Sequence, residues 1–119
     1  MIRRLKTYTA QTGFVYQYYF VGQRDALPQA PEAPAIEYVF DVTQDRKTTY
    51  AISVFLGADA LEAWTLNHGR SLTHSEKYAA AKMRLFQGFD DEADLLAGER
   101  RLLISPENIE VMLGELGLE

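Results

Sequence analysis

The chain has 119 residues, of which 47% are hydrophobic and 24% are charged, and it carries a formal net charge of −5. This length and composition predict one globular domain over residues 1–119 rather than a disordered segment. The absence of cysteine excludes disulfide bonds, thiolate metal sites and a cysteine nucleophile, and the negative charge argues against nucleic-acid binding.

The amino terminus is basic, but polar threonines and a glutamine follow it instead of an apolar run. A secretory signal needs such a run, and a membrane-spanning helix needs about 20 apolar residues in succession. The sequence shows neither pattern. We therefore expect a cytoplasmic protein that does not cross a membrane.

The first half of the chain is predicted to form a sheet. Residues 12–21 are rich in aromatic and β-branched side chains, which favour a strand, and an earlier strand is expected within residues 2–10. Residues 36–43 and 49–56 each alternate apolar with other side chains, and a polar turn at 44–47 separates them. This pattern is typical of a β-hairpin.

A proline-rich segment at residues 23–35 separates the aromatic strand from the hairpin. Pro28, Pro31 and Pro34 recur at every third residue, which is the period of the polyproline II helix. Proline also disfavours helix interiors and central strands. We interpret the segment as a surface connection within the domain; the alternative is a docking segment for a partner with an aromatic groove.

The second half of the chain is predicted to be mainly helical. A helix that starts near residue 58 is expected to end at Gly69, because glycine favours the backbone conformation that closes a helix. The next helix begins after Thr73, since Thr73 and Glu76 have the spacing of a capping box. We expect this helix to break near Gly88, and a new helix to begin there with Asp90 as its cap.

A short edge strand and a further helix complete the pattern. Residues 101–104 fit the strand, and Ser105 followed by Pro106 is a helix-start signal. The elements together predict an α+β fold. In it, an antiparallel sheet of three to five strands from the N-terminal half is packed on one face by three to four helices from the C-terminal half.

The turn between the two central helices, residues 67–76, is the best candidate for a ligand site. It holds His68, Arg70, Thr73 and His74 beside a helix N-terminus. Free amides at a helix N-terminus attract anions, and arginine binds phosphate or carboxylate through two parallel hydrogen bonds. The turn therefore predicts a small anionic-ligand binder; the alternative is a capped connection with no ligand.

The sequence has no glycine-flanked serine, no phosphate-binding loop and no dinucleotide fingerprint, so we predict no catalytic residue. The enzymatic alternative uses His68 or His74 as an acid–base catalyst. The spacing of the two histidines matches no recurrent pattern of metal ligands. We therefore expect neither a metal nor another cofactor.

The aromatic strand carries apolar side chains on both of its faces, so we expect both faces of the sheet to be covered. Tyr16, Tyr18, Tyr19 and Phe20 favour an interface, where aromatic residues are enriched. We therefore expect a homodimer and interpret the chain as a non-enzymatic protein-interaction or accessory protein. The acidic residues 90–119 offer an alternative surface for a basic partner.

Overall fold

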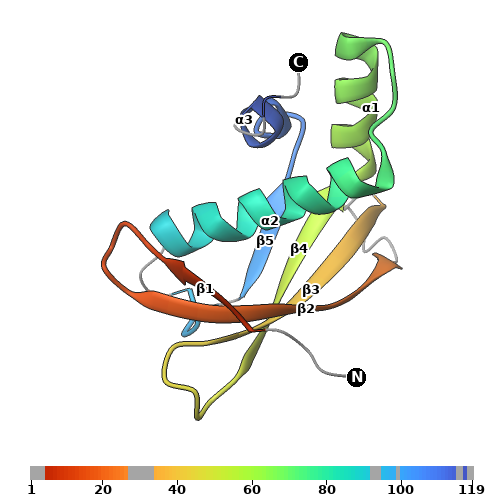
Figure 1. The fold of residues 1–119 in the computed structure, drawn as a ribbon. Helices are drawn as coiled ribbons and strands as arrows, with labels where there is room; N and C mark the ends of the chain where they lie inside the picture. Colours follow the sequence, from red (N-terminus) through yellow and green to blue (C-terminus); the bar gives the residue numbers. More distant parts are fainter. Residues whose placement is uncertain (1–4, 27–33, 92–94, 99, 115–116, 118–119) are drawn as a thin grey trace.

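The computed structural model describes residues 5–26, 34–91, 95–98, 100–114 and 117. Within them the chain forms a five-stranded sheet and three helices (Figure 1). In chain order these are β1 (Lys6–Thr9), β2 (Val15–Ala26), β3 (Ala35–Thr43), β4 (Tyr50–Gly57), α1 (Ala58–His68), α2 (His74–Asp91), β5 (Arg101–Ile104) and α3 (Ile109–Gly114). The predicted α+β class is confirmed.

The sheet has the order β1-β2-β3-β4-β5, so strands that are neighbours in sequence are also neighbours in space. Each neighbouring pair among β1 to β4 is antiparallel, but β5 runs parallel to β4. The prediction of a purely antiparallel sheet was therefore wrong. The reason is that the connection between β4 and β5 contains α1 and α2, and a long helical crossover of this kind joins parallel strands. The helices are also not gathered after the strands, because β5 lies between α2 and α3.

The predicted strands are present with shifted limits. The strand expected at 12–21 is β2, which starts later and continues to Ala26. It therefore includes the first residues of the segment 23–35, which the prolines were expected to keep out of regular structure. The polyproline prediction falls mainly on residues 27–33, which lie outside the described residues. The hairpin around 44–47 is confirmed as β3 and β4.

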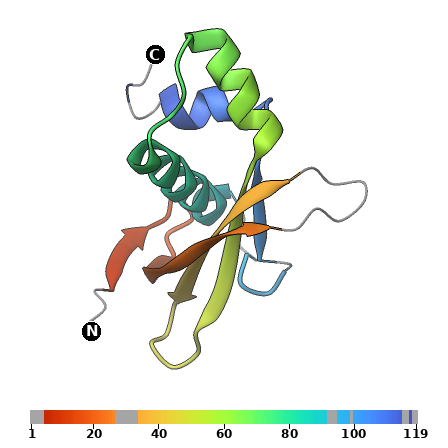
Figure 2. The same ribbon diagram turned by 90° about the vertical axis from the view of Figure 1, so that its right-hand side faces the viewer.

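Helix α2 lies across one face of the sheet, while α1 and α3 lie beyond the end at which β4 and β5 finish (Figures 1 and 2). The layer between α2 and the sheet is aromatic. Phe89 stacks on Tyr16 with 4.1 Å between ring centroids, and Phe86 stacks on Tyr8 at 4.3 Å. Burial of these large rings supplies much of the driving force for packing the two layers.

The other face of the sheet is not covered by any helix of the described residues; we call it the open face (Figure 2). Its side chains are identified by strand alternation, because Tyr38, Phe40 and Val42 are fully buried towards α2. The intervening residues of β3, and their partners on the neighbouring strands, therefore point away from the helices.

Helix α2 continues through Gly88 without interruption, so the predicted break was wrong. The glycine instead allows close packing, since a Cβ at this position would lie 2.9 Å from Leu102 Cδ1 of β5. Asp90 does not cap a new helix. It accepts hydrogen bonds from the Tyr8 hydroxyl (2.7 Å) and the Gln11 amide (2.9 Å), which attaches the β1–β2 turn to α2.

None of the helices in the described part of the chain is both long and apolar enough to span a bilayer.

Candidate functional site

Three of the four aromatic residues expected at an interface lie beneath α2. Tyr16 and Tyr18 are buried, with 0% and 4% of their surface exposed. Phe20 is half-buried and makes an edge-on contact with Tyr78 of α2, at 4.9 Å between ring centroids. In the chain these rings are covered by its own helix rather than by a second copy. Tyr19, which alternates with them, is the one of the four that lies on the open face.

The turn at 67–76 is held together by its own side chains. Arg70 donates two parallel hydrogen bonds to Glu76, Nη1 to Oε1 (2.9 Å) and Nη2 to Oε2 (3.0 Å). The Thr73 amide donates to Glu76 Oε1 (2.8 Å), and the Glu76 amide donates to Thr73 Oγ1 (3.2 Å), which confirms the capping box. The guanidinium expected to bind an anion therefore already binds a carboxylate of the chain.

These bonds stabilise the charged form of Glu76. The hydrogen bonds from Arg70 contribute most, followed by that from the Thr73 amide, and they lower the pKa of Glu76 to about 2. Glu76 is therefore negatively charged at neutral pH, and an anionic ligand would have to displace it from Arg70.

The two histidines occupy different positions. His68 stacks on Trp64 at 4.2 Å between ring centroids, and its Nε2 lies 2.7 Å from Glu110 Oε1, which joins α1 to α3. Arg70 lies over the same indole, 5.0 Å from its centre. His74 is exposed on the first turn of α2. The structure thus places His68 and Arg70 around one tryptophan and leaves His74 at the surface.

A shallow apolar hollow of about 240 Å³ lies between α1 and the start of α2. Leu61 and Leu66 form part of its wall, but none of the four residues predicted to bind a ligand does. Within the described residues, no group of three or more histidine, aspartate or glutamate side chains is placed to hold a metal ion.

The open face carries an apolar strip that consists of Val39, Phe55 and Leu103. Phe55 and Leu103 are register partners on β4 and β5, and Val39 lies one row further along, on β3. Leu103 is 54% exposed, and the other two side chains are partly exposed. Arg101 lies over the ring of Phe55, 4.8 Å from its centre.

A paired carboxylate borders this apolar strip. Glu37, whose register partner on β4 is Phe55, accepts hydrogen bonds from Arg24 Nε (2.7 Å) and Ser53 Oγ (2.6 Å). The Arg24 bond is the main cause of a lowered pKa of Glu37, so the carboxylate stays charged although only 8% of the residue is exposed. The strip therefore has charge of both signs at its border.

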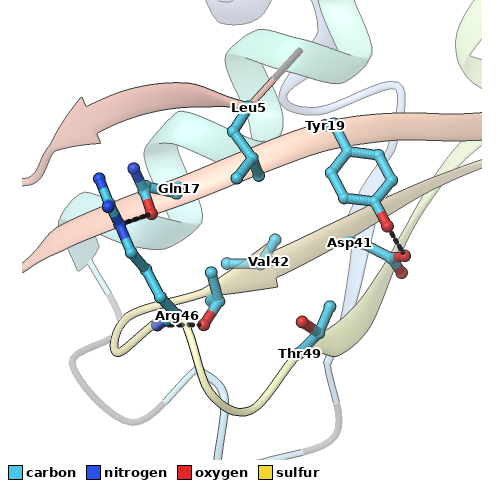
Figure 3. Close-up of a pocket in the computed structure, with 8 residues that line it drawn as sticks. Leu5, Gln17, Tyr19, Asp41, Val42, Arg46 and Thr49 are labelled. Atoms are coloured by element: carbon cyan, nitrogen blue, oxygen red, sulfur yellow. Dashed lines mark hydrogen bonds between the residues drawn. The ribbon is translucent and has the colours of Figure 1, made fainter. Parts of the chain in front are cut away.

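A second hollow, of about 380 Å³, lies on the open face near the β3–β4 turn (Figure 3). Its lining includes Leu5, Gln17, Tyr19, Asp41, Arg46 and Thr49. These residues come from β2, from β3, from the β3–β4 turn and from the residue that precedes β1, so their separation in the sequence hides the site. The signal that could have found it is the register of β2 with β3, which pairs Gln17 with Thr43 and Tyr19 with Asp41.

Comparison with known proteins found no matching family model, curated protein or solved structure. Support for a function therefore comes from the chain's own side chains: those of the open face and those of the turn at 67–76.

Proposed function

We propose that this chain is a non-enzymatic protein-interaction or accessory protein that forms a homodimer through the open face of its sheet. The observation that carries the proposal is the apolar strip, which is exposed on a face that no described helix covers. Two sheets commonly pack face to face, with the side chains of their inner faces interdigitated. A second copy would cover Leu103 and Phe55 in this way.

A second copy suits the strip because a two-fold interface joins the same patch from both chains, so the patch has to be complementary to itself. The strip has an apolar centre, and its border combines the cations Arg24 and Arg101 with the carboxylate of Glu37. An apolar centre with a polar rim is the usual arrangement of a protein interface.

Side chains of the turn at 67–76 are bound to other residues of the chain. This favours a protein-interaction role over anionic-ligand binding and over acid–base catalysis. Anion binding by Arg70 would require it to leave Glu76. His68 is stacked on Trp64 and bound to Glu110, and it lines neither of the two hollows. The proposal therefore places function on the sheet rather than on the helical turn.

Light scattering at micromolar concentration tests the proposal. The wild-type chain is expected to show twice the mass of one chain, which is 13.5 kDa, whereas Leu103→Asp is expected to show the mass of a monomer. A buried aspartate in an apolar interface carries a large desolvation cost. Leu66→Asp is the matched control, because Leu66 is 78% exposed on α1, and this variant should remain a dimer.

Circular dichroism of both variants checks that each retains the fold. A wild-type chain that is monomeric at these concentrations overturns the homodimer, as does a Leu103→Asp variant that dimerises as well as Leu66→Asp.

A further inference from the structure

The hollow near the β3–β4 turn has a volume within the range of small-molecule sites. Its volume of about 380 Å³ falls in the range of roughly 300–1,000 Å³ that is usual for such sites. Leu5 and the ring of Tyr19 form apolar parts of the wall, and Thr49 lies on the opposite side from Leu5 (Figure 3). An aliphatic group would therefore find apolar surface between polar rims.

The two rims carry opposite charges. On one side the Tyr19 hydroxyl donates to Asp41 Oδ2 (2.7 Å), and on the other Arg46 Nε donates to Gln17 Oε1 (2.9 Å) (Figure 3). These two bonds orient the charged groups. Among the described residues, they leave Asp41 Oδ1 and the two terminal nitrogens of Arg46 available to a ligand.

The register sets a minimum distance between the rims. Gln17 pairs with Thr43 and Tyr19 pairs with Asp41, so the two rows of side chains are two residues apart along each strand. Two residues of a strand span about 7 Å. Arg46 reaches from the turn to the side of Gln17 that faces away from Asp41 (Figure 3), so the guanidinium and the carboxylate lie further apart than the two rows. A ligand that reaches both rims therefore needs a spacer of several methylene groups between its charged ends.

The β3–β4 turn holds Arg46 in place at an energetic cost. Arg46 has a φ of 64°, in the left-handed region that non-glycine residues rarely adopt. Its amide donates to Thr43 Oγ1 (3.0 Å), and Asp45 Oδ1 accepts from the amides of Lys47 (2.8 Å) and Thr48 (2.9 Å). Strained residues that the surrounding structure holds in place cluster at binding sites.

We propose that this hollow binds a small linear zwitterion, with its cationic group on Asp41, its anionic group on Arg46 and its methylene chain against Leu5 and Tyr19. The pair of charges selects this class of ligand. A simple anion would be repelled by Asp41, and a simple cation would be repelled by Arg46. The inference does not depend on the homodimer, because the hollow lies outside the apolar strip.

Nuclear magnetic resonance titration of the ¹⁵N-labelled chain tests this site with three probes of one chain length. The probes are δ-aminovalerate, which is zwitterionic, valerate, which has only the anionic group, and n-pentylamine, which has only the cationic group. We expect saturable shifts of the amides in the hollow with δ-aminovalerate. Since one exposed charge pair contributes up to about fivefold in affinity, each single-charge probe should bind about fivefold more weakly.

The variants Arg46→Gln and Asp41→Asn should each weaken δ-aminovalerate binding by a similar factor, and each should remove the preference over one single-charge probe. Asp41→Asn keeps an acceptor for Tyr19, and Arg24→Gln is a control outside the hollow that should bind as the wild type does. Leu103→Asp should also bind normally, which separates this test from that of the homodimer.

The proposal is overturned if the three probes bind equally, if no saturable shift occurs in the hollow, or if the affinity is the same in Arg46→Gln, Asp41→Asn and the wild type. The comparison of probes on the wild-type chain stands even if a variant does not fold.

Discussion

Glu76 binds two of the groups that were predicted to bind an anionic ligand, the Arg70 guanidinium and the Thr73 amide. Its carboxylate caps the first turn of α2 through the Thr73 amide and binds Arg70 with both oxygens. A charge-assisted pair with two parallel bonds is among the stronger polar contacts of a protein. At this position, it orients Arg70 over Trp64 and so links the turn to α1.

We expect Glu76→Gln to change the acid stability of the chain. The pKa of Glu76 falls from 4.5 to about 2 on folding, so its contribution to stability is fully present above pH 4.5 and is lost as the pH drops towards 2. Glu76→Gln lacks this contribution at every pH. Urea unfolding should therefore show a lower stability than wild type at pH 7 and a smaller difference at pH 3.

The matched control for this measurement is Glu62→Gln, which removes an exposed carboxylate from α1. It isolates the local contacts of Glu76 from the change in net charge, and its stability should stay close to that of the wild type at both pH values. A gap between Glu76→Gln and wild type that is equal at pH 7 and pH 3 contradicts the account.

At the scale of the elements, the signals for the end of α1 and the start of α2 were reliable, and features that depend on tertiary packing were not predicted. Gly69 ends α1 with a left-handed φ of 71°, and Thr73 caps α2, as predicted, because both signals act within one helical turn. The parallel pairing of β5 depends on the path of two helices, and the continuity of α2 at Gly88 depends on contact with Leu102. Neither is encoded in a short window of sequence.

The same distinction explains what was foreseen of the candidate sites. The residues at 67–76 are close together in the sequence, so they were easily noticed. Glu110, which binds His68, lies on α3 and is far from them in the sequence. The residues that line the hollow, in contrast, are far apart in the sequence. Gln17 and Asp41 come together only through the register of β2 with β3. The side chains of Tyr16 and Tyr18 were expected at an interface, because the sequence does not show that α2 covers that face.

Gly69→Ala tests the end of α1. The glycine amide donates to the Thr65 carbonyl at 2.9 Å in a left-handed conformation, and a Cβ there would meet no other atom within 4 Å. The cost of the substitution is therefore that of the backbone conformation alone, about 1 kcal/mol of unfolding free energy. Urea unfolding measures it.

Gly114→Ala is the comparison for this variant. Gly114 is the last residue of α3, a Cβ would also meet no atom within 4 Å, and its φ lies outside the left-handed region. Its stability should change little. Equal destabilisation by the two substitutions would show that the left-handed conformation of Gly69 does not set the cost.

At the scale of the whole molecule, a helix covers one face of the sheet, and the open face carries both candidate sites. Helix α2 covers the aromatic face of the sheet, and the side chains of the turn at 67–76 bind one another and α3. The open face keeps the apolar strip and the charged hollow at separate places. The net charge of −5 therefore says little about this face, whose arginines come from three different segments.

The central claim is that two copies meet through the apolar strip, and short contacts between side chains of different chains test it most directly. A mixture of isotope-labelled and unlabelled chains gives a filtered NOE spectrum that contains only contacts between copies. We predict NOEs from the methyl groups of Leu103 to Val39 or Phe55 of the second copy. NOEs from Leu66 on α1 in place of these, or no NOE between copies at a concentration where the mass is that of a dimer, would contradict the claim.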